Sequence, residues 1–173
     1  MAEFQLYSYF RSSSSYRVRI ALHLKNIEHE IHAVHLLHQG GEQHFEDYKK
    51  LNPMEQVPLL VHQNRQITQS LAILSYLDRL NLKPFLFPDE ALLSAKVWEF
   101  CEVINSGIQP LQNLSVLQRL EAKCQFGPVE KKAWGQHFNE LGLQSLERLL
   151  EGTSGPFAFG AEVSAADVCL VRQ

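Results

Sequence analysis

The sequence has few of the features that anchor a chain to a membrane or hold a small secreted fold together. Its 3 cysteines among 173 residues are too few for a disulfide framework, and none forms the Cys-x-x-Cys pair of a structural zinc site. No run of about 18 apolar residues predicts a membrane span. Residues 1–10 lack the basic start and long apolar core of a signal peptide. We therefore expect a cytoplasmic protein in a reducing compartment, with no membrane partner.

A large excess of one charge sign is also missing. The chain has 16 Lys and Arg residues against 19 Asp and Glu residues, a net charge of -3, and its pI is near 6.2. Nucleic-acid-binding domains usually present a basic stripe, so no nucleic-acid partner is expected. Hydrophobic residues make up 45% of the sequence, which is enough for a buried core. The length predicts one or two small domains.

The first half of the sequence alternates between strand and helix patterns. Aromatic and β-branched residues with a period of two predict strands, and apolar residues spaced by three or four predict helices. The expected elements, in chain order, are a strand over 4–9, a helix over 16–25, a strand over 27–37, a short helix over 42–50, strands over 57–61 and 66–68, and a helix from 69. The β-α-β start requires a parallel first pair, and the late hairpin adds an antiparallel pair.

Strand patterns disappear after residues 83–90, a segment with two prolines. Four apolar residues then recur on one helix face: Val97, Cys101, Ile104 and Ile108. Pro128 suits the first turn of a further long helix. Ser164 followed by Asp167 has the spacing of a capping box at another helix start. The second half is therefore predicted to be all helical.

These patterns predict two domains with a boundary near Pro84. Residues 1–83 form the expected α/β domain, and residues 90–173 form the expected all-helical domain. The two prolines of the connecting segment favour a break because proline neither continues a helix nor donates to a sheet.

Four consecutive serines, Ser12 to Ser15, lie between the first predicted strand and the first predicted helix. Ligands in open α/β sheets bind at the carboxyl ends of strands, and a helix N-terminus offers an anion free N–H groups and partial positive charge. Three nearby arginines would strengthen this field: Arg11, Arg17 and Arg19. The same residues also fit a solvated loop whose serine only caps the helix. A dinucleotide or P-loop site is not predicted, because neither glycine motif is present.

Histidine recurs at every third position from residue 29 to residue 38. The four residues are His29, His32, His35 and His38. Residues three apart on a strand point to opposite faces, and the β-branched residues of this segment favour a strand, so no metal is predicted. Cys101, Trp98 and Trp134 are interpreted as packing residues of the helical half.

Four segments resemble a known family. They read Tyr-Ser-Tyr-Phe-Arg-Ser-Ser-Ser-Ser-Tyr-Arg-Val-Arg over 7–19, Leu-Asn-Pro-Met-Glu-Gln-Val-Pro over 51–58, Gln-Ser-Leu-Ala-Ile over 69–73, and Ile-Gln-Pro-Leu-Gln-Asn-Leu-Ser-Val-Leu over 108–117. Together they resemble the zeta-class glutathione transferases, also known as maleylacetoacetate isomerases, in register over essentially the whole chain. The resemblance implies an α/β plus all-α architecture, in which a thioredoxin-like N-terminal domain precedes a helical glutathione-transferase C-terminal domain.

The resemblance also implies a reaction. Glutathione is a cofactor that is not consumed: its sulfur adds reversibly to the cis double bond of maleylacetoacetate, the resulting single bond rotates, and fumarylacetoacetate is released. This reaction belongs to tyrosine and phenylalanine breakdown. A homodimer and a small dicarboxylate substrate are implied as well. Two alternatives stay open, a broader zeta-type transferase acting on small α-halo acids and a glutathione-binding member with impaired catalysis.

Individual residues take their roles from the same resemblance. Ser12 matches the catalytic serine, with Ser13 beside it, and its hydroxyl would donate a hydrogen bond to the glutathione sulfur. The expected glutathione-binding set is Ser12, Ser13, Ser14, Ser15, Tyr16, Arg17, Gln43, Val57, Pro58, Gln69, Ser70, Gln109, Asn113, Leu114 and Ser115.

Three parts of that set correspond to three parts of the ligand. The backbone of Val57 would pair in strand fashion with the cysteinyl part of glutathione. It precedes the family's cis-proline, Pro58, although the residues alone favour trans because only about 5–6% of X–Pro bonds in folded proteins are cis. Gln69 and Ser70 match residues that hold the γ-glutamyl carboxylate, and Gln43 matches a residue near the glycyl end.

Two departures from the family pattern are visible. Ser14 stands where the family usually has cysteine, so a thiol-specific role at that position, such as a mixed disulfide with glutathione, is absent. Family members continue well past Val171, usually through a Val-Pro-Gln step, whereas this sequence ends Val-Arg-Gln. The helical domain is therefore expected to be incomplete relative to the family.

Overall fold

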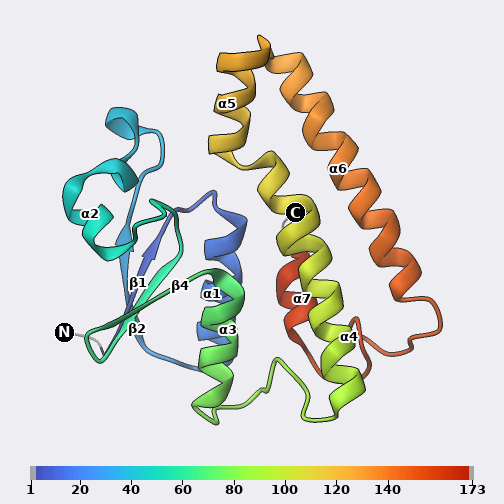
Figure 1. Cartoon of the computed structure of the whole chain (residues 1–173). Helices are drawn as coiled ribbons and strands as arrows, with labels where there is room; N and C mark the ends of the chain where they lie inside the picture. Colours follow the sequence, from blue (N-terminus) through green and yellow to red (C-terminus); the bar gives the residue numbers. More distant parts are fainter. Residues whose placement is uncertain (1–2, 172–173) are drawn as a thin grey trace. The chain divides into compact units, whose positions relative to one another are not determined.

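In the computed structural model, which describes residues 3–171, a four-stranded sheet forms the centre of the first half of the chain (Figure 1). Its strands are β1 (Phe4–Ser8), β2 (His29–Ala33), β3 (Leu59–His62) and β4 (Arg65–Thr68), in the spatial order β2-β1-β3-β4. β1 and β2 are parallel, and β3 is antiparallel to both β1 and β4. The predicted parallel first pair and antiparallel hairpin are confirmed.

The chain divides into two compact units, residues 3–86 and residues 87–171. Arg172, where the family has proline, lies outside the described residues.

The first unit contains three α-helices. They are α1 (Ser13–Leu24), α2 (Glu46–Leu51) and α3 (Ser70–Arg79). α1 and α3 contact each other and supply its best-buried helix residues. Fully buried leucines and other apolar residues join them to the sheet: Leu6, Val18, Leu22, Leu59, Leu60, Ile73, Leu74 and Leu77. Each such side chain contributes roughly 1.5–3 kcal/mol when it is removed from water.

A second apolar cluster includes the single buried residue of α2, Tyr48. It consists of Tyr9, Val34, Tyr48, Val57 and Leu59, with Tyr7 packed against it. The Tyr48 hydroxyl donates to the backbone oxygen of Gln56 at 2.6 Å. Burial raises the pKa of this hydroxyl, which therefore stays protonated.

Two boundaries differ from the predicted ones, the start of α1 and the end of β2. α1 begins at Ser13, three residues before the expected start, because the Ser12 side chain caps it. β2 ends at Ala33, shorter than the predicted 27–37. Beyond it, the His35 N–H donates to the Glu42 carboxylate at 2.6 Å, which closes a loop and stops further pairing with the sheet.

A buried lysine after α1, Lys25, connects this helix to α3 and to the segment that follows α3. The Lys25 side chain has no exposed surface and its Nζ lies 2.7 Å from the Asp78 carboxylate. Nζ also donates to the backbone oxygens of Leu82 and Pro84, each at 2.7 Å. The Asp78 carboxylate in turn accepts from the Leu86 N–H at 2.9 Å. These bonds tie the connecting segment to α1 and α3, so the first unit extends beyond Pro84 to residue 86.

The second unit is all helical, as predicted. Its α-helices are α4 (Ala91–Glu102), α5 (Leu114–Cys124), α6 (Pro128–Leu149) and α7 (Ala165–Leu170), with a wider π-turn over Val103–Ile108 and a 3₁₀ turn over Gln109–Gln112 after α4. The predicted apolar face is confirmed, since its four residues are fully buried: Val97, Cys101, Ile104 and Ile108. Gly142 of α6 packs on Ile108, where a Cβ would come within 2.3 Å, so α6 requires glycine at this contact.

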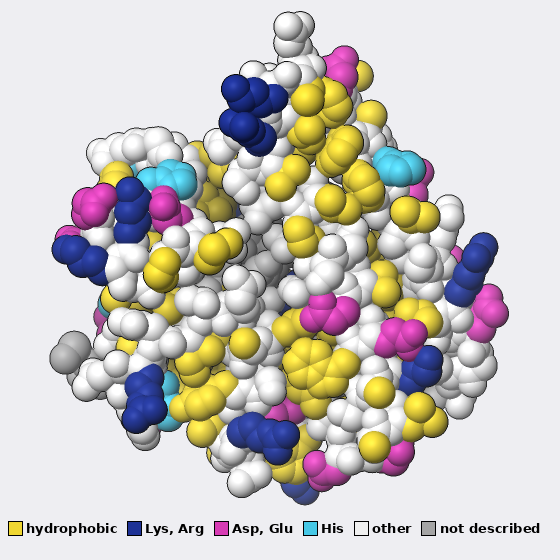
Figure 2. Space-filling view, viewed as in Figure 1, with side chains coloured by type: hydrophobic (Ala, Val, Ile, Leu, Met, Phe, Trp, Pro, Cys, Tyr) yellow, Lys and Arg dark blue, Asp and Glu magenta, His cyan; other side chains and the backbone are white. Residues whose placement is uncertain are grey.

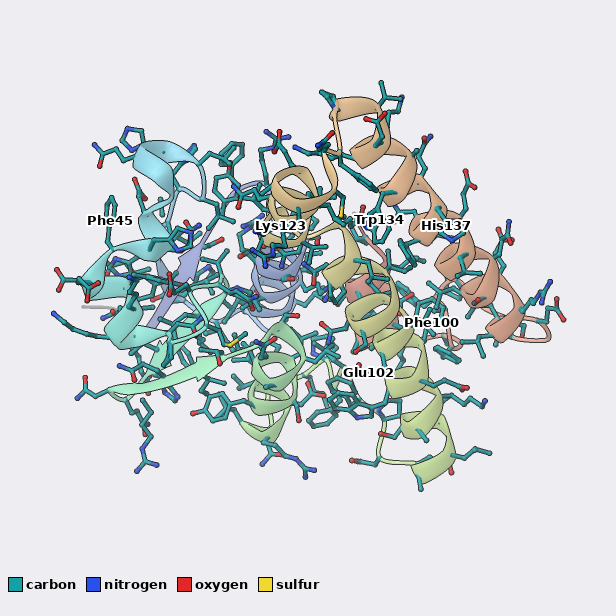
Figure 3. The ribbon with its side chains drawn as sticks, turned by 45° about the horizontal axis from the view of Figure 1, so that its top comes forward. Phe45, Phe100, Glu102, Lys123, Trp134 and His137 are labelled. Carbon is teal, nitrogen blue, oxygen red and sulfur yellow. The ribbon has the colours of Figure 1, made fainter. Side chains whose placement is uncertain are left out.

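Aromatic residues of α6 pack against the segments that flank α5. The Trp134 Nε1–H donates to the Leu111 oxygen at 2.7 Å, and the Trp134 ring packs edge-on against Phe126 and Phe138. Figure 2 shows hydrophobic side chains gathered along these two helices, and Figure 3 shows Trp134 on α6 and Phe100 on α4. The predicted packing role of Trp134 is confirmed.

The last described helix begins with the predicted capping box. The Asp167 carboxylate accepts from the Ser164 N–H at 2.8 Å and from the Ala158 N–H at 2.8 Å. It thereby orders both the start of α7 and the preceding loop. No helix within residues 3–171 combines the length and apolarity needed to cross a bilayer.

Replacing Lys25 with Ala is expected to destabilise the protein by about 3 kcal/mol, because it leaves a nearly buried carboxylate and two carbonyl oxygens without their cation. Urea denaturation followed by far-UV circular dichroism measures this change. Lys50→Ala is the matched control: its ion pair with Asp47 is exposed and its loss should leave the midpoint unchanged. Equal midpoints for both variants would contradict the role of Lys25.

Candidate functional site

Strand register brings three distant segments to one end of the sheet. Tyr7 near the end of β1 pairs with Leu59 at the start of β3, and Leu59 pairs with Thr68 at the end of β4. The chain therefore leaves β1, enters β3 and leaves β4 at the same end. The serine run, Val57–Pro58 and Gln69–Ser70 are the segments that follow or precede these positions, so the sheet collects them there.

Ser12 is the N-cap of α1. Its Oγ accepts from the Ser15 N–H at 3.1 Å, and its carbonyl accepts from the Tyr16 N–H at 3.0 Å. A hydroxyl that accepts one hydrogen bond keeps its own proton for donation. The first N–H groups of a helix have no partner within the helix, so those of Ser13 and Ser14 remain available beside that hydroxyl. The cap interpretation is confirmed, and it leaves the anion-binding interpretation intact.

Arg17 links the serine run to the start of α3. Its side chain is fully buried and Nη1 donates to the Ser70 Oγ at 3.2 Å. Ser70 is itself buried and is the first residue of α3. The preceding Gln69 has a positive φ of 68°, and it turns the chain from β4 into the helix. A buried positive charge thus lies under the N-terminus of α3.

Arg19 is engaged inside the first unit. Its Nη1 donates to the Ser8 Oγ at 2.6 Å and to the Tyr9 oxygen at 3.3 Å, and its guanidinium lies over the Tyr16 ring at 5.2 Å. These contacts connect α1 to the end of β1. Arg11 is exposed. The three predicted arginines therefore differ: Arg17 and Arg19 hold the scaffold of the site, and Arg11 faces solvent.

The peptide bond between Val57 and Pro58 is cis, as the family resemblance implied and the residues alone did not. The registers of β3 with both β1 and β4 begin at Leu59. Val57 therefore precedes the paired region, and its backbone groups are placed where a further extended segment could pair with them.

Gln43 lies in the loop between β2 and α2 and is 5% exposed. Its Nε2 donates to the His44 Nε2 at 3.0 Å and approaches the Leu36 oxygen at 3.5 Å. The amide packs on Gly41, whose φ is 107° and where a Cβ would come within 2.5 Å of it. The positive φ favours glycine at position 41, and the absence of a side chain there leaves the space that the Gln43 amide occupies.

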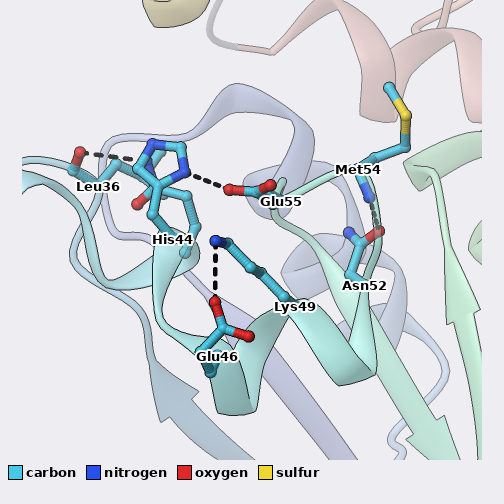
Figure 4. Close-up of polar contacts among 8 residues, drawn as sticks. Leu36, His44, Glu46, Lys49, Asn52, Met54 and Glu55 are labelled. Atoms are coloured by element: carbon cyan, nitrogen blue, oxygen red, sulfur yellow. Dashed lines mark hydrogen bonds and ion pairs between the residues drawn. The ribbon is translucent and has the colours of Figure 1, made fainter.

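Sequence reasoning missed the partners of Gln43. The His44 Nδ1 lies 2.5 Å from the Glu55 carboxylate, and Figure 4 shows this pair beside Lys49, which bonds to Glu46. The hydrogen bond from His44 lowers the pKa of Glu55. His44 and Glu55 are separated by α2 and carry no motif, so no sequence pattern could have joined them.

The remaining predicted residues form one segment of the second unit. Gln109 begins the 3₁₀ turn, Asn113 precedes α5, and Leu114 and Ser115 form its first turn. Ser115 is exposed and the other three are partly buried. The structure brings these four residues together with one another, in a unit separate from the serine run.

The four histidines of the recurring pattern make local contacts. His29 bonds to the Ile27 oxygen, His32 stacks on Tyr7, and the His35 Nδ1 accepts from the His38 N–H. Nearby, the backbone N–H of His35 lowers the pKa of Glu42. Among residues 3–171, no group of three or more His, Cys, Asp and Glu side chains is arranged to hold a metal ion.

Comparison with known proteins shows which family the chain resembles. Residues 2–79 match the family model described as glutathione S-transferase, N-terminal domain. The chain is 48% identical to maleylacetoacetate isomerase of Mus musculus over 97% of this chain and 75% of that protein. A holo structure of a bacterial maleyl pyruvate isomerase, a zeta-class glutathione S-transferase, superposes with a TM-score of 0.93 at 31% identity, over 97% of this chain and 79% of that one.

A second solved structure carries ligands. Maleylacetoacetate isomerase from Methylobacterium extorquens AM1, with bound malonate and GSH, superposes with a TM-score of 0.92 at 32% identity. The alignment covers 97% of this chain and 79% of that one.

Replacing Ser12 with Ala is expected to lower the free energy of unfolding by about 1 kcal/mol, because the Ser15 N–H loses its cap. Ser12→Gly should cost only a few tenths of a kcal/mol, since glycine is tolerated at an N-cap. Urea denaturation of the two variants measures the difference. An unchanged midpoint in Ser12→Ala would show that the cap does not stabilise α1.

Proposed function

The chain belongs to the zeta class of glutathione S-transferases, and from this premise we propose that it isomerises maleylacetoacetate to fumarylacetoacetate with glutathione as its cofactor. The 48% identity to the mouse isomerase over nearly the whole chain is the observation that carries the proposal. The collection of the serine run, Val57–Pro58 and Gln69–Ser70 at one end of the sheet supports it.

The residues of the first unit fit glutathione, which is an extended tripeptide with two carboxylates, two amides and a thiol. An extended ligand suits the backbone of Val57, which lies next to a strand but outside its pairing. The γ-glutamyl carboxylate suits the N-terminus of α3, where Arg17 places a buried positive charge behind Ser70. Gln43 offers a buried amide for the glycyl end.

Bound glutathione would supply a thiolate whose reversible addition to the double bond permits rotation about it. Ser12 would donate its free hydroxyl proton toward the sulfur, because its Oγ already accepts from the Ser15 N–H. Donation to the sulfur favours the charged form and lowers the thiol pKa. The partial positive charge at the start of α1 acts in the same direction. The serine thus stabilises an anion and needs no basicity of its own.

The replacement of the usual family cysteine by Ser14 leaves this arrangement in place. Ser14 is the second residue of α1, and the cap is Ser12. Its hydroxyl cannot form a disulfide with glutathione. We therefore expect the isomerase chemistry to depend on Ser12 and to proceed without any thiol of the protein in the serine run.

Maleylpyruvate is a second candidate substrate, because the structure with a TM-score of 0.93 is named a maleyl pyruvate isomerase. Both compounds carry two carboxylates and a cis double bond next to a carbonyl group, so the same chemistry serves both. The greater identity to the mouse maleylacetoacetate isomerase favours the first candidate. The sequence also left open a broader transferase that acts on small α-halo acids. Activity on such an acid would indicate this alternative.

The purified chain is expected to isomerise maleylacetoacetate only when glutathione is present, and to do so with a higher kcat/KM than for maleylpyruvate or dichloroacetate. Ser12→Gly should lower kcat about a hundredfold, as the loss of one hydrogen-bond donor to a reacting anion does elsewhere. It should change glutathione affinity by less than about tenfold, because the other contacts remain. Absorbance assays and calorimetry measure the two quantities.

The comparison of Ser12→Gly with Ser12→Ala separates chemistry from folding, since only the alanine variant loses the helix cap. Equal loss of turnover in both, with different stabilities, supports a chemical role for the hydroxyl. Glutathione binding by the wild-type chain without isomerisation of either substrate would favour the impaired glutathione-binding member instead.

The family also supports a homodimer in the cytoplasm. Sedimentation equilibrium is expected to give about twice the chain mass of 19.8 kDa, and fractionation of the source cells checks the compartment. A single species of one chain mass at micromolar concentration would contradict the dimer.

A further inference from the structure

Three side chains contact one another in series at the loop that holds Gln43, in the order Glu55, His44, Gln43. Glu55 lies 2.5 Å from the His44 Nδ1, and the His44 Nε2 lies 3.0 Å from the Gln43 Nε2. The resemblance that assigned Gln43 to glutathione gave no role to the other two. Figure 4 shows His44 between Leu36 and Glu55, with its ring turned toward the carboxylate.

Glu55 selects the tautomer of His44. A carboxylate only accepts hydrogen bonds, so the His44 Nδ1 must carry the proton. In the neutral ring, Nε2 then has a lone pair and is an acceptor. Glu55 remains charged because the hydrogen bond from His44 and the nearby Lys49 both lower its pKa. Lys49 also bonds to Glu46 at 3.1 Å.

The turn before β3 holds Glu55 in place. Asn52 is buried, and its Oδ1 accepts from the Met54 N–H at 3.0 Å (Figure 4). The Asn52 carbonyl accepts from the Glu55 N–H at 2.9 Å. Such a side-chain turn restricts the backbone, so the carboxylate is presented from a fixed position two residues before Val57.

His44 in turn fixes the orientation of the Gln43 amide. The lone pair on the His44 Nε2 requires an N–H, so the amide nitrogen must face His44. The reverse orientation would direct the amide oxygen at that lone pair and at the Leu36 oxygen. The Gln43 Oε1 therefore faces away from His44, and it is buried with no donor among the described residues. A buried acceptor without a partner costs about 1–3 kcal/mol, which a donor from a ligand would recover.

We propose that His44, oriented by Glu55, is a positioning residue that holds the Gln43 amide oxygen ready to accept an N–H of bound glutathione. This inference rests on the proposed function, because it takes glutathione as the ligand of Gln43.

Calorimetric titration of the full chain with glutathione tests the proposal. His44→Leu should weaken binding about threefold to tenfold, the value of one hydrogen bond, with kcat at saturating glutathione unchanged. His44→Gln should restore most of the affinity, because its amide supplies an acceptor for Gln43 and a donor for Glu55.

His38→Leu is the matched control. Its side chain is 60% exposed against 52% for His44, and it also contacts a carboxylate, that of Glu42. Glutathione affinity should not change in this variant. In a Gln43→Ala background, His44→Leu should have no further effect, because a positioning residue acts only through the side chain it positions.

The outcomes separate this inference from the proposed function. Wild-type binding that His44→Leu leaves unchanged, or a full additional loss in the Gln43→Ala background, would overturn the role of His44 alone. No glutathione binding by the wild type would overturn the proposed function and the ligand assigned to Gln43. Nitrogen NMR of the free protein provides a readout that needs no ligand: a proton on the His44 Nε2 at neutral pH would overturn the inferred amide orientation.

Discussion

Pairing of Tyr7 with Leu59, and of Leu59 with Thr68, is the constraint on which the candidate site depends. It makes β3 antiparallel to β1, so that the start of one strand lies beside the end of the other. The cap of α1, the cis Val57–Pro58 bond and the start of α3 then lie at one end of the sheet. A slip of one residue would turn the side chains of β3 to the opposite face and remove Leu59 from the core.

Two buried cations stabilise this arrangement, one within α1 and one just after it. Arg17, in the second turn, reaches Ser70 at the start of α3. Lys25, just after the helix, uses its three protons on Asp78 and the oxygens of Leu82 and Pro84. A cation after the last turn is also favoured by the helix dipole. α1 therefore positions the serine run and also anchors α3 and the connecting segment.

Much of the secondary structure could be predicted, because the spacing of apolar residues shows which side of a helix or strand is buried. The helix face of the second unit and the capping box at Ser164 were both recognisable from spacing alone. Boundaries were less accessible. The early start of α1 depends on the Ser12 cap, and the early end of β2 depends on a bond between the His35 N–H and Glu42. These are single contacts with no periodic signal.

The family resemblance supplied the candidate residues, but not the contacts that organise them. Arg17 was expected to bind glutathione, and the structure shows it fully buried and bonded to Ser70. His44 and Glu55 were not expected at all. Such contacts cannot be predicted from a sequence, because the two residues are distant along the chain and belong to common residue types.

The sequence by itself determined the strand and helix order, the helical second half and the serine cap of α1. These depend on local spacing and on the chemistry of single side chains. Only the tertiary structure decided that the serine run, Val57 and Ser70 share one end of the sheet, and that Glu55 orients Gln43 through His44. Strand register and loop closure bring these residues together, and both are properties of the folded chain that no local pattern encodes.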